Sequence, residues 1–215
     1  MQIEQSIKPR RGRPAKSPED LEAMRATLIR NGMELLTERG YSSTGIDAIL
    51  KPAGVPKGSF YYYFSSKEQF IGEVIDAYSA YFAQLLDRHL LNTAQTPLKR
   101  IQEFVEAASA GMARFNYKRG CLVGNLGQEM STLPEVFRFQ IESVFADWES
   151  RLAQCLRDAQ QQGEISPSAN PQMLAYIFWI GWEGAVLRAK LEQTDRPMKL
   201  FAQEFLNTNR HTTQP

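Results

Sequence analysis

The sequence has little of what secreted, membrane-spanning or metal-binding proteins need. Its 215 residues include two cysteines and two histidines, too few for a disulfide framework, so a reducing compartment is expected. The longest strongly apolar stretch, residues 173–182, is too short to cross a bilayer. Residues 1–16 lack the apolar segment of a signal peptide. These absences exclude secreted and membrane-spanning proteins, and we expect a cytoplasmic protein.

Cofactor chemistry also lacks support in the sequence. No residues have the spacing of metal ligands, and no glycine-rich loop follows a strand to hold a phosphate. The histidines are His89, late in a long helical segment, and His211, in a polar tail, so neither forms a Cys–His pair by sequence position. We therefore expect no metal, no cofactor and no enzyme, although a cysteine-dependent enzyme is kept as a remote alternative.

The overall composition is that of an ordinary globular protein, but its charge is divided unevenly. Hydrophobic residues make up 43% and charged residues 23% of the chain, and the net charge is +1. Residues 1–67 carry eleven Lys and Arg against seven Asp and Glu, whereas residues 68–215 carry fourteen against seventeen. A basic N-terminal part suggests contact with a polyanion. A solubilising tail is the alternative, which charge alone leaves open.

Apolar residues recur at helical spacing over most of the chain, which predicts an all-α fold. Ser17, Pro18 and two acidic residues mark the start of a first helix, and Gly40 marks its end. Eight further helices are expected, at about 46–52, 56–63, 67–92, 97–116, 120–131, 134–162, 170–191 and 196–208. The chain is thus expected to divide into a basic arm (1–17), a DNA-binding domain (18–66) and a ligand-binding and dimerisation domain (67–215).

Two short helices joined by a glycine turn form the most specific pattern. Ala-Gly-Val at residues 53–55 separates them, which is typical of a helix-turn-helix. The stretch YSSTGIDAIL (41–50), followed by GVPKGSFYYYFSSK (54–67), closely resembles the signature of TetR-family transcriptional regulators. The resemblance covers about the first 70 residues and implies an operator-binding protein. The residues expected to bind DNA are Thr44, Lys57, Gly58, Ser59, Tyr61, Tyr62 and Lys67.

These residues also make physical sense for DNA binding. Lysine, serine and tyrosine side chains on one short helix reach phosphates and base edges, and amides at a helix N-terminus attract anions. Phe60 and Phe64, four residues apart, are expected to hold this helix to its domain. The preceding arm contributes Arg10, Arg11 and Arg13, and its Arg-Gly-Arg-Pro sequence resembles arms that enter the minor groove.

The last two predicted helices are expected to form a homodimer. In TetR-family proteins the final two helices of each subunit form a four-helix bundle with the partner, and the resemblance implies the same here. Apolar residues occupy more than one face of these helices, which argues against the alternative that they only close a monomer core. They are Leu174, Ile177, Phe178, Leu187, Leu191, Leu200, Phe201 and Phe205.

A segment rich in glycine, residues 119–130, is the most unusual part of the body. Its Cys121, Asn125 and Gln128 share one helical face and are expected to line a pocket. A second cluster follows one face of the 170–191 helix and consists of Trp179, Trp182, Glu183, Val186 and Lys190. Together these segments resemble the TetR branch of the acrylate-utilisation repressor and of a repressor that senses electrophiles and hypochlorite through a cysteine.

The resemblance implies that Cys121 is a sensor thiol and that Lys190 is the amine beside it. A nearby ammonium would lower the pKa of the thiol and increase the reactive thiolate fraction. An acrylate carboxylate would pair with Arg188 or Lys190, or its alkene would add to Cys121. The alternative is that Cys121 is a small buried hydrophobe, the role we also expect for Cys155.

The sequence therefore predicts a homodimeric, DNA-binding transcriptional repressor. A small acrylate-like carboxylate or a reactive electrophile or oxidant would release it from its operator by changing the spacing of the two DNA-binding heads. A DNA-binding dimer without any small-molecule ligand is the main alternative.

Overall fold

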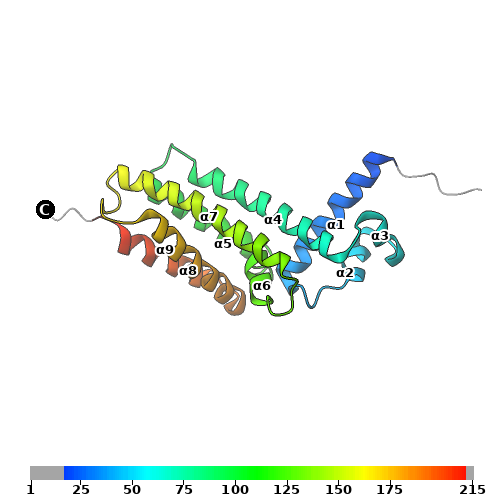
Figure 1. Cartoon of the computed structure of the whole chain (residues 1–215). Helices are drawn as coiled ribbons and strands as arrows, with labels where there is room; N and C mark the ends of the chain where they lie inside the picture. Colours follow the sequence, from blue (N-terminus) through cyan, green and yellow to red (C-terminus); the bar gives the residue numbers. More distant parts are fainter. Residues whose placement is uncertain (1–16, 212–215) are drawn as a thin grey trace, which may run out of the picture.

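The computed structural model describes residues 17–211, and Arg10, Arg11 and Arg13 lie outside this range. Within it the chain is helical, apart from an isolated β-bridge between Ile165 and Arg210. The α-helices, labelled in Figure 1, are α1 (Pro18–Arg39), α2 (Ile46–Leu50), α3 (Phe60–Tyr63), α4 (Lys67–Leu90), α5 (Pro97–Arg114), α6 (Leu122–Gln128), α7 (Val136–Gln161), α8 (Pro171–Glu192) and α9 (Arg196–Asn209). Two 3-10 turns, Lys51–Ala53 and Lys57–Ser59, flank the α2–α3 turn. The all-α prediction is confirmed.

Capping residues fix the ends of the helices where the sequence predicted them. The Ser17 hydroxyl accepts from the backbone N–H of Asp20, whose carboxylate accepts in turn from Ser17. Gly40 ends α1 with a positive φ of 78°, which glycine adopts without strain. The main difference is α6, expected over 120–131. It starts only at Leu122, because the Cys121 thiol caps its first turn.

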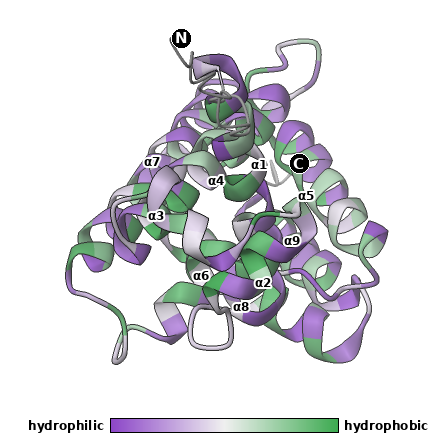
Figure 2. Cartoon of the chain, turned by 90° about the vertical axis from the view of Figure 1, so that its right-hand side faces the viewer, coloured by the Kyte–Doolittle hydropathy of each residue, from purple (hydrophilic) through white to green (hydrophobic). Residues whose placement is uncertain are grey.

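The helices build an elongated molecule in which α1–α3 occupy one end (Figure 1). Helix α4 starts at that end, packs against α1 and continues into the body, where it contacts α5 and α7. Helix α8 packs between α7 and α9. In Figure 2, seen from the end that carries α1–α3, hydrophilic and hydrophobic residues alternate along the helices, as expected for helices with one buried face.

Aromatic side chains fill the centre of the body. The Trp148 ring lies 4.3 Å from that of Phe82 and 5.0 Å from that of Trp179. Phe104 extends the cluster to Trp182 at 5.5 Å. These residues come from α4, α5, α7 and α8, so one cluster joins four helices. Within residues 17–211, none of the helices combines the length and apolar character that a membrane span requires.

A second aromatic cluster holds the N-terminal end together. The rings of Phe60, Phe64 and Phe70 lie 4.8 to 5.7 Å apart, and all three side chains are fully or almost fully buried. This placement confirms that Phe60 and Phe64 attach α3 to its domain. Gly32 allows α1 to approach α4 closely, because a Cβ there would lie 2.6 Å from the Phe70 ring.

Candidate nucleic-acid interface and effector site

The turn between α2 and α3 has the geometry of a helix-turn-helix. Gly54 adopts φ 63°, in the left-handed region that favours glycine. The N–H of Val55 returns to the carbonyl of Leu50 at 3.2 Å, closing the turn. Beyond it, Pro56 precedes the 3-10 turn Lys57–Ser59 that leads into α3. This tight turn presents α3 at the end of the molecule (Figure 1).

Helix α3 buries one side and exposes the other. Tyr61 and Tyr62 are 66% and 64% exposed, whereas Phe60 and Tyr63 are buried. Lys57 and Gly58 are also exposed, and Ser59 is half-buried. The two exposed tyrosines of this four-residue helix suit contacts with phosphates and base edges.

Both predicted DNA-binding lysines have partners in the free protein. The Nζ atom of Lys57 lies 2.9 Å from Oδ2 of Asp47 on α2. This pair is exposed, so it adds little stability and is easily replaced by a phosphate. Lys67 lies over the Tyr41 ring at 4.0 Å. Burial lowers the pKa of Lys67, against the opposing effect of Glu68 and Glu129.

Thr44 does not lie on this surface, in contrast to the prediction. Its side chain is 2% exposed. The hydroxyl donates to the carbonyl of Gly40 at 2.6 Å, and its backbone N–H donates to Tyr41. These bonds make Thr44 part of the α1–α2 connection, so its side chain is not available for DNA.

Arg25 fastens the end of α3 to the neighbouring helices, a role that the sequence did not reveal. Its guanidinium donates to the carbonyl of Tyr63 and to both carboxylate oxygens of Glu73 on α4. It also lies over the Phe64 ring at 4.5 Å. One arginine of α1 thus fixes α3 against α4.

The last turn of α1 is bound by the segment that contains α6. Nδ2 of Asn125 donates to the carbonyls of Leu36 and Thr37 at 3.1 and 2.9 Å. The backbone N–H of Gly120 donates to Thr37 at 3.1 Å. The Leu36 carbonyl also accepts from the backbone N–H of Gly40 at 3.1 Å, so Asn125 adds a second bond to it. The Thr37 carbonyl lies in the last turn, where carbonyls lack the next turn of the helix as a partner, and the bonds from Asn125 and Gly120 satisfy it.

Lys190 of α8 completes this arrangement. Its Nζ atom donates to the carbonyls of Glu38 at 2.9 Å and of Thr37 at 3.3 Å. A cation at a helix C-terminus is also favoured by the helix dipole. Burial lowers the pKa of Lys190, while Glu38 acts in the opposite direction. The Lys190 stem packs beside Gly120, but its ammonium points to α1 rather than to the thiol.

Glu129, just after α6, binds the α1–α2 loop. Its Oε1 and Oε2 atoms accept from the backbone N–H groups of Tyr41 and Ser42, each at 2.8 Å. Burial would raise the pKa of Glu129, but these hydrogen bonds outweigh burial and lower it. On the other side of Asn125, Arg119 pairs with Glu34 of α1 at 3.0 Å. The α6 segment therefore holds α1 from both sides.

Cys121 lies at the start of α6 in a buried position. Its Sγ atom accepts from the N–H of Gly124 at 3.3 Å, and the Tyr78 hydroxyl hydrogen-bonds to the same thiol. Burial and the nearby Glu183 raise the pKa of Cys121 well above its usual value. The expected lowering by Lys190 is therefore wrong, because the ammonium is engaged by α1.

Glu183, a member of the second predicted cluster, lies beside Cys121, a position that the sequence did not predict. A Cβ at Gly124 would overlap Oε2 of Glu183, so the missing side chain lets the carboxyl reach the backbone of α6. Its Oε1 atom is buried and has no hydrogen-bond partner among the described residues. Burial raises the pKa of Glu183 to about 7. An acidic residue between Trp182 and Gly184 in an apolar helix was the available signal.

The remaining predicted effector residues separate into a buried and an exposed group. Trp179 and Trp182 are buried, and the indole N–H of Trp179 has no partner among the described residues. Gln128 is exposed. Arg188 is also exposed and pairs with Glu192 at 2.9 Å. Asn125 and Lys190 bind α1, so the predicted pocket face is an interface with α1. Cys155 is buried, its Sγ atom 3.4 Å from the carbonyl of Pro97, as a structural cysteine would be.

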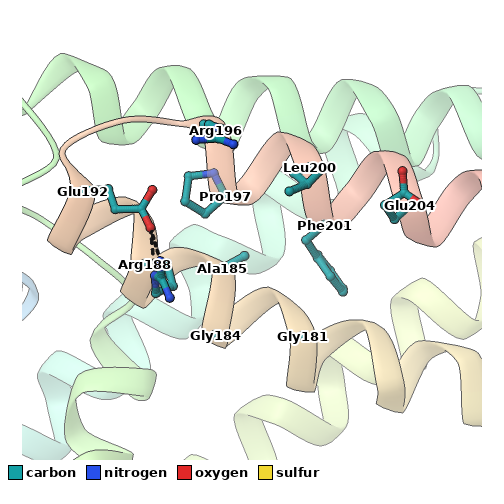
Figure 3. Close-up of a pocket in the computed structure, with 10 residues that line it drawn as sticks. All are labelled: Gly181, Gly184, Ala185, Arg188, Glu192, Arg196, Pro197, Leu200, Phe201 and Glu204. Carbon is teal, nitrogen blue, oxygen red and sulfur yellow. Dashed lines mark hydrogen bonds and ion pairs between the residues drawn. The ribbon is translucent and has the colours of Figure 1, made fainter.

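Helices α8 and α9 carry a long exposed apolar face. A groove of about 400 Å³ lies between α8 and α9 (Figure 3), and its lining combines Leu200 and Phe201 with the charged residues Arg188, Glu192, Arg196 and Glu204. The Phe201 ring crosses from α9 toward Gly181 of α8, which has no side chain in its way (Figure 3). The exposed large apolar residues of this face are Met173, Tyr176, Ile177, Ile180, Leu187, Leu191 and Leu200. Among the residues expected there, Phe178 and Phe205 are instead buried within the subunit.

Comparison with known protein families gives two matches. Residues 28–74 match the family "Bacterial regulatory proteins, tetR family", and residues 97–205 match "Tetracyclin repressor-like, C-terminal domain". Transcriptional regulator AcuR of Cereibacter sphaeroides is 52% identical over 92% of this chain and 90% of its own length. HTH-type transcriptional repressor NemR of Escherichia coli is 28% identical over 81% of this chain and 88% of its own.

Solved structures agree with these matches. A regulatory protein TetR from Rhodobacter sphaeroides, 52% identical, superimposes with a TM-score of 0.83 and covers 86% of this chain and 97% of its own. The reduced form of E. coli NemR, 27% identical, gives a TM-score of 0.80 over 89% of this chain and all of its own.

Within residues 17–211, no cluster of three or more His, Cys, Asp or Glu side chains could hold a metal ion.

Replacing Glu183 by glutamine is expected to stabilise the protein at alkaline pH. The raised pKa means that ionisation of Glu183 opposes folding as pH rises from about 4.5, its ordinary value, to about 7. The unfolding free energy of Glu183→Gln minus that of wild type should therefore increase by about 2 to 3 kcal/mol as the pH rises from 5 to 8. Urea denaturation at matched protein concentration measures this difference. A constant difference across that range would show that Glu183 is not buried as a carboxylate.

Proposed function

The chain belongs to the TetR family of transcriptional regulators, and from that premise we propose that it is an operator-binding homodimer released by a small carboxylate or a reactive electrophile. Its relatives and its fold are those of regulators, not enzymes. In this proposal, residues 18–66 bind DNA in the cytoplasm, residues 67–215 dimerise and sense the effector, and the basic arm adds Arg10, Arg11 and Arg13 in the minor groove.

The exposed side of α3 supports the DNA-binding part of the proposal. It presents Lys57, Gly58, Tyr61 and Tyr62 together, with Ser59 and Lys67 at its borders. Two such heads in a dimer would dock in successive major grooves on the same side of the duplex. Tyr61 and Tyr62 are the large exposed side chains of α3, so they are the first to test.

Tyr61→Ala and Tyr62→Ala are each expected to weaken operator binding about tenfold or more, because each removes contacts worth about 1 to 3 kcal/mol. Neither should change the free energy of unfolding much, since both side chains are largely exposed. Tyr81→Ala is the matched control, an exposed tyrosine on α4 in the body. Fluorescence anisotropy with DNA from upstream of the protein's own gene measures affinity. Equal operator affinity of all three variants would show that α3 is not part of the DNA interface.

The α8–α9 face supports the dimer. Apolar residues recur along α8 at the spacing of one helical face, and Leu200 adds an exposed apolar side chain on the neighbouring α9. An exposed apolar face of this length marks an interaction surface. A second copy would present the same face and form a four-helix bundle with a two-fold axis.

Ile180→Glu is expected to dissociate the dimer, because it places a charge at the centre of this face. Light scattering should then give the 24.5 kDa mass of one chain instead of twice that mass. Phe139→Glu on α7 is the control, since Ile180 and Phe139 are 60% and 65% exposed. A dimer that survives Ile180→Glu, or one lost equally in both variants, would place the interface elsewhere.

The surroundings of Cys121 support an effector site in the body. Beside the buried thiol, Oε1 of Glu183 is a buried oxygen without a hydrogen-bond partner among the described residues, and the indole N–H of Trp179 on the same helix is a buried donor without one. Of these groups, the indole N–H is the one that would donate to a carboxylate ligand. Lys190 is bound to α1, whereas Arg188 is exposed, pairs with Glu192 and lines the groove between α8 and α9.

The single observation that carries this proposal is the position of Cys121 at the start of α6, the helix that binds α1. A change at the thiol or at Glu183 would shift α6, and with it Asn125 and Glu129, which hold the last turn of α1 and the loop after it. The protein would leave its operator if the effector binds more tightly to the conformation in which the spacing of the two DNA-binding heads does not fit DNA.

Operator complexes of wild type, Cys121→Ser and Cys155→Ser titrated with acrylate, and separately with hypochlorite or a quinone, test this role. We expect wild type and Cys155→Ser to be released and Cys121→Ser to resist the electrophiles. Release of Cys121→Ser by acrylate would identify a non-covalent carboxylate site. Failure of every effector to release wild type would overturn the effector proposal and leave a DNA-binding dimer without such a ligand.

A further inference from the structure

The thiol of Cys121 is held in its protonated form, which raises the question of how it would react. Burial and Glu183 both act against the thiolate, and only the N–H of Gly124 and the hydroxyl of Tyr78 act in its favour. The pKa of Cys121 therefore lies well above its usual value. Since a thiol adds to electrophiles as its thiolate, reaction at neutral pH requires that a neighbouring group take the proton as the bond forms.

The carboxyl of Glu183 is the neighbour placed for this task. A Cβ at Gly124 would lie 3.4 Å from the Cβ of Cys121 and would overlap Oε2 of Glu183. The carboxyl therefore reaches the first turn of α6 beside Cys121 because Gly124 has no side chain. Its Oε1 atom is buried and has no partner among the described residues. This leaves one carboxyl oxygen without a structural role beside a thiol that needs a base.

Other titratable groups near the thiol are less suited to accept its proton. The Tyr78 hydroxyl accepts from the backbone N–H of Leu122, and burial raises the pKa of Tyr78 well above its usual value. Further along α8, Arg188 points to Glu192 and Lys190 to the end of α1. Burial raises the pKa of Glu183 to about 7, which makes it a stronger base than an ordinary carboxylate at neutral pH.

We propose that Glu183 is the general base that takes the proton of Cys121 when the thiol adds to an α,β-unsaturated carbonyl compound. The sulfur forms a bond to the β-carbon, and the electron pair of the C=C bond moves toward the carbonyl. The S–H proton passes to the Glu183 carboxylate and then to the α-carbon. The product is a thioether, Glu183 is returned as a carboxylate, and no oxidant or reductant is consumed. This inference rests on the proposed electrophile response.

Two effects of Glu183 have opposite signs, which makes the inference testable. As a negative charge near the thiol, Glu183 raises the pKa of Cys121 and slows its reaction. As a base, it accelerates the reaction. Removing the carboxylate therefore speeds alkylation if Glu183 acts only through its charge, and slows it if Glu183 takes the proton.

The experiment measures alkylation of Cys121 by acrylamide in the full-length protein, with Cys155→Ser to leave one thiol. Intact-mass spectrometry between pH 5.5 and 9.5 gives the rate. With Glu183 present, the rate should rise to a plateau with a midpoint near pH 7. With Glu183→Gln it should fall at least tenfold at pH 7.5 and increase steadily with pH. A rate for Glu183→Gln equal to or above that of the parent, or no alkylation of the folded parent at pH 8, would overturn the inference.

Gly124→Ala provides an independent variant that keeps the carboxylate. Its Cβ would displace Glu183 from the start of α6, so alkylation should slow although both reacting groups remain. Circular dichroism of each variant verifies folding. Unchanged kinetics in Gly124→Ala would contradict the inference even if Glu183→Gln failed to fold. Operator binding by the alkylated protein separates the two proposals. If Glu183 assists the alkylation of Cys121 but the alkylated protein stays bound to its operator, Glu183 is still the base, and only the proposal that alkylation is the effector response is refuted.

Discussion

The position of the DNA-binding end depends on the bonds that the body makes to the last turn of α1. The carbonyls of Thr37 and Glu38 lie at the end of the helix, and Asn125 and Lys190 supply their hydrogen bonds. A buried carbonyl left without a partner costs free energy comparable to a lost hydrogen bond. A movement of α6 or α8 would therefore also move α1. Helix α3 would move with α1 because Arg25 of α1 is bonded to the end of α3.

The same short segment connects the two proposed activities. Its start carries Cys121, its middle carries Asn125, and Glu129 follows its end. Because α6 has only seven residues, little of it is independent of both the thiol and α1. A displacement of one end of α6 is therefore transmitted to the other end. The two arrangements of the DNA-binding heads need differ in free energy by only a few kcal/mol for an effector to select between them.

The sequence alone predicted the helices, most of their ends and the outer face of α3, because these depend on local signals such as Ser17, Gly40 and Gly54. The expected site was less accurate where contacts between distant segments decide. Thr44 is buried by the α1–α2 connection, which no local pattern announces. Lys190 lies near the segment that contains Cys121, but its ammonium donates to α1 carbonyls that are 152 and 153 residues away in the sequence.

The surroundings of Cys121 favour selectivity over speed. A thiolate stabilised by a cation reacts with many electrophiles and oxidants, since its nucleophile is always present. A protonated thiol beside Glu183 reacts well only with an electrophile that reaches both groups at once, because proton transfer and bond formation must then coincide. Burial, which at first sight argues against a reactive cysteine, also raises the basicity of Glu183. The two effects have one cause, so a change that exposes the site would increase the thiolate fraction of Cys121 while weakening its base.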